Sequence, residues 1–392
     1  MKKMRACIIC ALFCAAALVS CSKAGQGDAP NRRVVLFYAA AFNNLSASIL
    51  QNIDTFFEGK MPAVGNNDVF LVYAHTPFRY GVYVKPTNPV LFRAYIGADG
   101  KLRRDTLIVY PDTDVSGSAE TLNKVMSDVQ NSFPAQSYGL IISSHGRGWL
   151  PPGYEESSTM SFKYDTKEIC MESPRLKGID ILDFPGAIPM HLDFMILDAC
   201  LMGCVEVAYE LKDKCDMLLF SPTEILSYGM DYKTMASRLL NCAKPDLIGI
   251  AKDFYELYQS QSGIFQSATV SLVDCKQLGQ LADAFRDIVS HHREGLENTD
   301  RNSVQAYFYN DYHWFYDLRD LLEKAGATAD EMRRLDATLD ACVIYKAATE
   351  KFFDLKLENV CGLSVYFPFP GAEELNNYYK TLAWNEATGL IQ

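Results

Sequence analysis

The chain has 392 residues, of which 49% are hydrophobic and 22% charged, and its formal net charge is −11. This composition excludes a disordered or collagen-like chain. The negative charge argues against a nucleic-acid partner, because binding to a phosphate backbone needs clustered Lys and Arg. The length fits two to three domain-sized units, or one large α/β domain with additions.

Residues 1–20 have the pattern of a secretory signal. Three basic residues precede an apolar run at 7–19, which is too short to cross a bilayer of about 30 Å as a helix. The run ends in Leu-Val-Ser before Cys21, which resembles a bacterial lipobox. The resemblance implies cleavage before Cys21 and lipidation of its thiol; a plain secretory signal cut nearby is the alternative.

Residues 21–32 are rich in Gly, Ala and polar side chains, which is typical of a flexible tether. No later apolar stretch is long and uncharged enough to span a membrane, so we expect an anchored protein that does not cross the bilayer. The expected location is the bacterial cell envelope, with the outer membrane favoured.

Strand and helix patterns alternate over residues 33–235, which we interpret as a catalytic core. Short β-rich apolar runs lie at 34–40, 69–75, 107–110, 138–144, 194–198 and 217–221. Helical patterns lie between them, at 46–57, 119–133 and 201–214. The alternation predicts an α/β fold whose central sheet is mostly parallel, with helices on both faces.

Residues 236–392 predict a largely helical C-terminal part that completes the sheet. Helical patterns occupy 233–243, 245–261, 274–293 and 329–348, with strands expected at 268–273 and 363–367 and a final helix at the C-terminus. Between the two strands at 138–144 and 194–198, residues 151–189 are proline-rich and lack periodicity. We expect a long loop there, and long loops inside compact domains are usually functional or mobile.

Two predicted strands end in residues that carry chemistry. One buried strand leads into His145, which is followed by Gly146 and Gly148, and another leads into Cys200. In open α/β sheets, ligands collect at the carboxyl ends of strands, so both side chains are expected at one edge. Taken singly, such a His is more often structural and such a Cys a small core residue. The pair instead indicates a Cys–His dyad.

The predicted dyad suits acyl transfer. A helix beginning directly after Cys200 favours the thiolate, and a neighbouring His accepts the proton and later protonates the leaving amine. The backbone N–H groups of Gly146 and Cys200 are the candidates for an oxyanion hole.

Several motifs together resemble the clostripain family of cysteine peptidases, relatives of caspases and gingipains. The matching segments are Ser144-His145-Gly146-x-Gly148-Trp149, Asp198-Ala199-Cys200-Leu201-Met202-Gly203 with Glu206, Tyr316-Asp317-Leu318 and Gly362-Leu363-Ser364-Val365-Tyr366-Phe367-Pro368. The resemblance implies a caspase-like α/β sandwich, with His145 as general base and acid and Cys200 as nucleophile.

The family resemblance also implies cleavage after Arg or Lys. An acid in the substrate pocket pairs with a guanidinium or ammonium group, and Asp198, two residues before Cys200, is the candidate. A structural or helix-capping role is the alternative for Asp198. Asp231 is a second candidate acid, although Met230 beside it departs from the Gly-Trp-x-Tyr pattern frequent in relatives.

Some relatives activate themselves by cleavage between the His and the Cys. The 151–190 loop offers basic residues for such a cut, namely Lys163, Lys167, Arg175 and Lys177. Calcium dependence also occurs in the family. The chain has no EF-hand spacing, so no metal-binding residues are assigned, and calcium remains an expectation from the resemblance alone.

Two other functions remain open at this point. A catalytically inactive envelope lipoprotein that binds peptides or a partner protein is the main alternative to a peptidase. A different thiol acyl-transfer enzyme, such as a transpeptidase, is the second.

The cysteines divide by expected role. Of the 12, three leave with the signal, Cys21 carries lipid and Cys200 stays a free thiol. An odd number then remains, so full pairing is impossible and a mostly unpaired set is expected: Cys170, Cys204, Cys215, Cys242, Cys275, Cys342 and Cys361.

Overall fold

The computed structural model describes residues 31–392, except for 81–82, 153, 155–177 and 308–313. Residues 31–392 form one compact unit. The predicted signal, most of the tether and Cys21 therefore lie outside the described residues. Within the described ranges, no helix has the length and apolarity needed to cross a bilayer.

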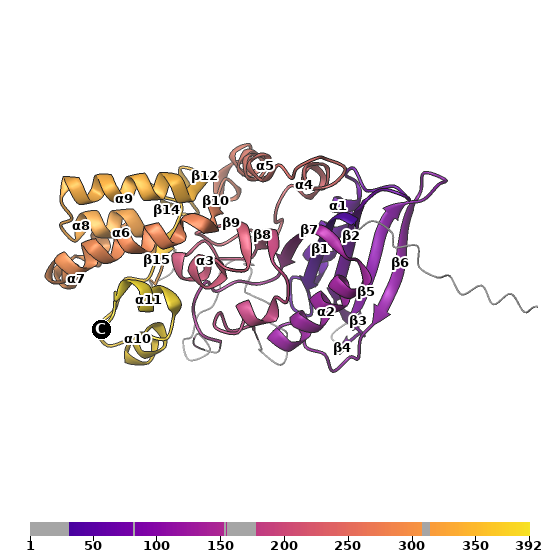
Figure 1. Ribbon diagram of the computed structural model, residues 1–392, viewed down its shortest axis with the longest axis horizontal. Helices are drawn as coiled ribbons and strands as arrows, with labels where there is room; N and C mark the ends of the chain where they lie inside the picture. Colours follow the sequence, from indigo (N-terminus) through magenta and orange to yellow (C-terminus); the bar gives the residue numbers. More distant parts are fainter. Residues whose placement is uncertain (1–30, 81–82, 153, 155–177, 308–313) are drawn as a thin grey trace, which may run out of the picture. The chain divides into compact units, whose positions relative to one another are not determined.

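A nine-stranded sheet forms the centre of this unit (Figure 1). Its strands lie in the order β12-β10-β9-β8-β7-β1-β2-β5-β6. The bounds are β1 Asn31–Ala40, β2 Asp68–His75, β5 Val90–Ile96, β6 Leu102–Val109, β7 Ala135–Ser143, β8 Leu192–Asp198, β9 Cys215–Phe220, β10 Thr269–Asp274 and β12 Val343–Ala348. The five central strands, β9 to β2, are parallel, as the sequence predicts, and the two strands at each edge are antiparallel.

Apolar side chains on both faces of the sheet explain its position inside the molecule. Along β1, Leu36 and Tyr38 pack into one core, while Val35 and Phe37 pack into the other. A strand buried on both faces reads as a continuous apolar run, which is the pattern expected for a parallel sheet between two helical layers.

The helices cover the two faces of the sheet. One core includes α1 (Ser46–Phe57), α4 (Tyr232–Leu239) and α5 (Leu247–Gln259). The other includes α2 (Ala119–Ser132), α3 (Val205–Leu211), α6 (Leu278–His291), α8 (Leu318–Lys324), α9 (Ala329–Cys342), α10 (Glu373–Tyr379) and α11 (Ala383–Thr388). This arrangement confirms the predicted helix–sheet–helix sandwich.

The C-terminal part completes one edge of the sheet through β10 and β12. The helix expected over 329–348 ends at Cys342, and its last six residues form β12 instead. Val343, Ile344 and Tyr345 are β-branched or aromatic, and such side chains favour a strand over a helix. The short strand β15 (Ser364–Val365) pairs with β11 (Tyr316–Asp317) in a separate two-stranded sheet.

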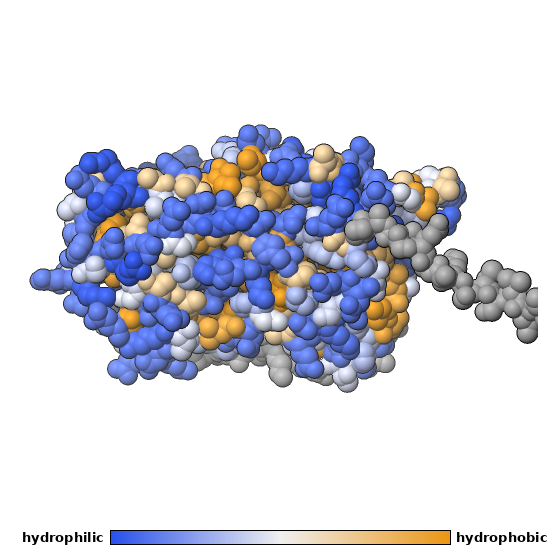
Figure 2. Space-filling view, in the orientation of Figure 1, coloured by the Kyte–Doolittle hydropathy of each residue, from blue (hydrophilic) through white to orange (hydrophobic). Residues whose placement is uncertain are grey.

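The remaining elements lie between the larger ones. They are β3 (Pro77–Tyr80) paired with β4 (Tyr83–Pro86), β13 (Lys351–Phe352) paired with β14 (Leu355–Lys356), and α7 (Arg293–Asn298). The face seen in Figure 2 is mostly hydrophilic, and its apolar residues gather in separate patches.

Candidate active site

Four neighbouring strands deliver the parts of the site to one edge of the sheet. Asn44 follows β1, His145 follows β7, Cys200 follows β8 and Ile225 follows β9. These strands are adjacent and parallel, in the order β9-β8-β7-β1. Their carboxyl ends therefore meet at the edge where ligands bind in open α/β sheets.

The register of β7 and β8 brings the two predicted catalytic segments together. Ser143 lies opposite Asp198, and the N–H of Ser144 donates to the carbonyl of Asp198 at 3.4 Å. Gly146 approaches Cys200 so closely that a Cβ on residue 146 would lie 2.6 Å from the Cys200 nitrogen. Only glycine fits there, and the two N–H groups expected to form the oxyanion hole are neighbours.

The thiol of Cys200 is held by the segment after β9. The N–H of Ile225 donates to Sγ at 3.3 Å, and Sγ lies 3.7 Å from the Ile225 carbonyl oxygen. Cys200 is 1% exposed and His145 6% exposed. Both predicted catalytic side chains are therefore buried in this conformation.

The turn after Cys200 differs from the prediction. The helix expected at 201–214 is α3, which begins only at Val205. Leu201 has φ +60, a left-handed conformation, and its N–H donates to the Thr223 carbonyl at 3.0 Å. The N–H of Gly203 donates to the Ser221 carbonyl at 2.8 Å. These N–H groups serve the β9 segment, so the predicted stabilisation of the thiolate by a helix N-terminus is wrong.

His145 has a polar partner that sequence patterns do not identify. Its Nε2 lies 2.6 Å from Oδ1 of Asn44. The backbone before Asn44 is fixed by Asn43, whose Oδ1 accepts from the Leu45 N–H at 2.9 Å and whose amide donates to the Ala40 carbonyl at 3.0 Å. The Asn-Asn pair after a buried strand is typical of an Asx turn and could indicate the turn, but it does not indicate that Asn44 contacts His145.

Asp198 is fully buried and held by hydroxyl groups. Its Oδ2 accepts from the Ser143 hydroxyl at 2.6 Å and from the hydroxyl of Tyr232, the first residue of α4. Burial, together with the nearby charge of Asp198, raises the pKa of Tyr232 well above its ordinary value, so its hydroxyl stays protonated and donates.

Asp231 occupies the N-cap position of α4. Its Oδ1 accepts from the Thr234 N–H at 3.1 Å, which satisfies one of the unpaired donors at the start of the helix. Its predicted contact with substrate stays a prediction, and Met230 beside it is buried. The four candidate cleavage sites, Lys163, Lys167, Arg175 and Lys177, lie outside the described residues.

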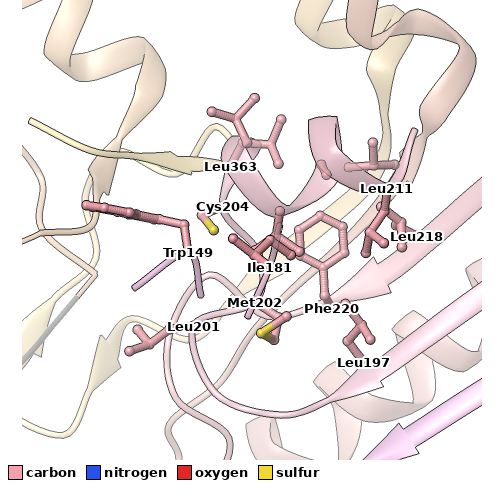
Figure 3. Packing of buried hydrophobic residues seen from close by; sticks show 14 of the residues in the cluster. Trp149, Ile181, Leu197, Leu201, Met202, Cys204, Leu211, Leu218, Phe220 and Leu363 are labelled. Carbon is pink, nitrogen blue, oxygen red and sulfur yellow. The ribbon is translucent and has the colours of Figure 1, made fainter. Parts of the chain in front are cut away.

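Behind the nucleophile turn, aromatic side chains surround a buried acid. Trp149 is fully buried, and its ring centroid lies 4.7 Å from that of Tyr366 and 4.9 Å from that of Tyr379. Figure 3 shows Trp149 gathered with Cys204 and Leu363 beside this turn. Glu206 accepts from the Tyr366 N–H at 2.8 Å and from the Tyr379 hydroxyl at 2.7 Å.

Burial raises the pKa of Glu206 to about 7, although these hydrogen bonds oppose the shift. Because Glu206 accepts a hydrogen bond from the Tyr366 N–H, the motif that contains Cys200 and Glu206 is in direct contact with the motif at residues 362–368. They meet at this carboxyl group.

Several of the other cysteines of the described part are buried thiols with raised pKa values. All seven described cysteines carry free thiols, and Cys170 lies outside the described residues. Burial raises the pKa of Cys342 to about 12 and holds the pKa values of Cys204 and Cys361 well above their ordinary value. Thiols of this kind stay protonated and inert. In the same described ranges, no group of three or more His, Cys, Asp or Glu is arranged to hold a metal ion.

Comparison with known proteins agrees with this arrangement. The model of the Clostripain family matches residues 37–388. The chain belongs to the clostripain family. This is a family of cysteine peptidases, and the resemblance found in the sequence motifs is confirmed. Clostripain of Hathewaya histolytica is 26% identical over 231 residues, which are 53% of this chain and 42% of that protein. The chain thus spans less than half the length of this relative.

Solved structures of C11 proteases share the fold. An inactive zymogen C11 protease from Parabacteroides distasonis is 30% identical, with a TM-score of 0.78 over 92% of this chain and 99% of that one. A secreted C11 cysteine protease from Bacteroides thetaiotaomicron is 25% identical, with a TM-score of 0.76 over 92% of this chain and 100% of that one. The predicted caspase-like α/β fold is confirmed.

Proposed function

We propose that the chain is a cysteine endopeptidase that cleaves peptide bonds after Arg or Lys. The observation that carries the proposal is the meeting of Asn44, His145, Cys200 and Ile225 at four adjacent strand ends. Cys200 is the nucleophile and His145 is its base and acid. The carboxylate of Asp198 recognises the basic side chain of the substrate.

The reaction follows from these positions. His145 takes the proton of the Cys200 thiol, and Sγ attacks the carbonyl carbon of the scissile bond. The N–H groups of Gly146 and Cys200 stabilise the oxyanion that forms. His145 then gives its proton to the leaving amine, the C–N bond breaks and a thioester remains. Water, deprotonated by His145, attacks the thioester and releases the acid and the thiol.

Asn44 orients the imidazole in this scheme. With the ring proton on Nε2, His145 donates to Asn44 Oδ1, and Nδ1 is the atom that exchanges a proton with the thiol. An amide that holds a catalytic His also occurs in papain-like peptidases, where the three groups are Cys, His and Asn. Asn44 is therefore a positioning residue.

The setting of Asp198 supports a preference for basic residues. Its Oδ2 is held in place by the hydroxyl groups of Ser143 and Tyr232, which fix the carboxylate at the end of β8, two residues before the nucleophile, where a guanidinium or ammonium group can pair with it. A Lys or Arg side chain entering this buried site finds the opposite charge that its own burial requires.

A panel of fluorogenic peptides tests this function. We expect turnover when Arg or Lys precedes the reporter, and none with Asp or Ala there. Asp198→Asn should abolish the preference for basic residues while leaving the thiol reactive. Release only after Asp contradicts the assignment of Asp198. No turnover of any peptide, in protein whose Cys200 thiol is still titratable, favours the inactive peptide-binding lipoprotein.

The burial of the nucleophile supports self-activation. Cys200 and Asp198 are 1% and 0% exposed in the uncut chain, which fits a site that opens to substrate after a change in the chain. We propose that cleavage after Lys163, Lys167, Arg175 or Lys177 supplies it. Wild type and Cys200→Ala expressed in parallel should give a cut and an uncut chain, respectively. An identical single-chain band from both contradicts the proposal.

We also propose that Cys21 is lipidated and holds the enzyme in the bacterial envelope. The lipobox-like pattern before Cys21 supports this location. Cys21→Ser should move the protein from the membrane fraction to the soluble fraction of the cells. Equal membrane association of both forms contradicts lipid anchoring through this residue.

A further inference from the structure

An exposed aromatic pair lies next to the candidate active site. Tyr228 is 65% exposed and Phe265 47% exposed, and their ring centroids are 6.1 Å apart in an edge-to-face arrangement. Ile264, the neighbour of Phe265, is 39% exposed. Large apolar side chains grouped at the surface beside a site usually mark a binding surface.

Residues before and after Tyr228 in the chain contact the candidate catalytic residues. Ile225, three residues earlier, holds the Cys200 thiol. Gly229, the next residue, packs so closely on Tyr232 that a Cβ there would lie 2.1 Å from the hydroxyl that donates to Asp198. The hydroxyl of Tyr258 donates to the Gly229 carbonyl at 2.7 Å and fixes this turn. Tyr228 is therefore the exposed part of a segment that lines the nucleophile and the acid.

The strand order decides which half of a substrate this segment contacts. His145 follows β7, on one side of Cys200, and it must face the leaving amine. Residues 221–231 follow β9, on the other side of Cys200. The acyl half of the substrate, which precedes the cleaved bond, thus runs along the β9 side, where Tyr228 lies.

We infer that Tyr228 and Phe265 form a subsite for an apolar side chain in one of the two substrate residues before the basic residue. The N–H of Gly229 donates to the Leu226 carbonyl at 2.8 Å, so the chain turns at Tyr228 and keeps this residue close to the segment that holds Cys200. The paired rings offer a flat apolar surface, which binds aliphatic and aromatic side chains through burial and ring contacts. This inference rests on the proposed peptidase function.

Paired peptides test the subsite. Each has Arg before the reporter and carries Leu or Asp at one of the two preceding positions. The wild type should prefer Leu over Asp by about tenfold in kcat/KM at one position, the discrimination typical of an apolar subsite. Tyr228→Ala and Phe265→Ala should remove this preference and leave the Asp peptide unchanged. Tyr228→Phe, which keeps the ring, should retain the preference.

Val109→Ala is the matched control, because Val109 is 59% exposed on β6, at the opposite edge of the sheet from β12. It should leave both peptides unchanged. The subsite is overturned if the wild type cleaves the Leu and Asp peptides equally well at both positions. It is also overturned if Tyr228→Ala or Phe265→Ala lowers kcat/KM by the same factor on every peptide.

Binding separates the two proposals. In the wild-type protein, calorimetric titration with the same peptide sequences, made uncleavable by reduction of the scissile amide to an amine, measures binding at the aromatic pair without any cleavage. A Leu preference in affinity that Tyr228→Ala removes supports the subsite even if no peptide is cleaved, and absence of cleavage then contradicts only the peptidase. Equal affinity for both peptides, or no affinity, overturns the subsite even where Arg peptides are cleaved.

Discussion

Cys200 lies between two regions that are held together by different forces. On the catalytic edge, side chains from four strand ends meet through single polar contacts, such as His145 with Asn44 and Ser143 with Asp198. Behind the turn, Trp149 and Glu206 are enclosed by tyrosines and apolar residues. A polar contact contributes little net stability, whereas buried aromatic area contributes much. Rate and stability should therefore be separable in this protein.

The largest effect on activity is expected from a substitution at the catalytic edge of the sheet. Cys200→Ala removes the nucleophile and should lower kcat/KM on Arg peptides by about 10⁴-fold or more. The free energy of unfolding, measured in urea, should change by only about 1 kcal/mol, because a small buried atom is lost. Cys242→Ala removes a half-buried thiol elsewhere and should keep full activity. Comparable loss in both variants would contradict the assignment of the nucleophile.

Trp149→Ala should lower the stability of the protein strongly, whereas Cys200→Ala should lower mainly its activity. Loss of a fully buried indole packed on Tyr366 and Tyr379 should cost about 3–5 kcal/mol of unfolding free energy. Trp149→Phe, which keeps part of the ring contact, should cost less than half of that. Urea unfolding followed by circular dichroism measures both. A cost below about 1 kcal/mol for the alanine variant would show that this packing does not hold the turn.

Glu206 should make the stability of the region around Trp149 depend on pH. Its pKa is raised from 4.5 to about 7, so between these values the folded chain keeps a proton that the unfolded chain has lost. Stability is then greatest below about pH 4.5 and falls by roughly 3 kcal/mol as the pH rises to about 7.

Because other groups titrate in the same range, the quantity to measure is the difference in unfolding free energy between wild type and Glu206→Gln. This difference should shift in favour of the Gln variant across the interval. A difference that stays constant from pH 4.5 to 7.5 contradicts a protonated Glu206.

The parts of this structure that the sequence can predict are those fixed by local patterns. The central strands and the two catalytic candidates follow from local patterns, because a strand buried on both faces is continuously apolar and its carboxyl end is where ligands bind. Asn44 and Tyr232 escape prediction because their partners, His145 and Asp198, are distant in the chain. Only the strand order brings these pairs together.

Two predicted helices were placed wrongly, because contacts with distant parts of the chain changed the local backbone. The helix expected after Cys200 starts late because Leu201 and Gly203 donate to carbonyls of the β9 segment rather than to a helix. Residues 343–348 leave the helical pattern because the edge of the sheet offers them hydrogen-bond partners along β10. Helical periodicity is a weak guide wherever a sheet edge or a site competes for the backbone.

A smaller change at the edge is expected from Asn44→Ala. Loss of one hydrogen bond to a catalytic imidazole, worth about 1–2 kcal/mol, should lower kcat by about tenfold with little effect on KM. Asn44→Asp keeps the acceptor and adds charge, so it should restore most of the rate and move the acid limb of the pH–rate profile to higher pH. Identical profiles for the Ala and Asp variants would reduce Asn44 to a structural role.

The smallest expected effect tests how Asp198 is held. Tyr232→Phe removes one of the two hydroxyl donors to its Oδ2, which loosens the carboxylate. KM for Arg peptides should rise about fivefold, equivalent to about 1 kcal/mol, while kcat stays the same.

The matched control is Tyr307→Phe, because Tyr307 donates to the buried Asp317 at 2.7 Å in the same kind of pair. That variant should lose stability alone, since Asp317 caps α8 and lies on β11, outside the central sheet. If both variants change only stability, the Tyr232–Asp198 contact belongs to the packing of the fold, and recognition of the basic side chain rests on the Asp198 charge alone.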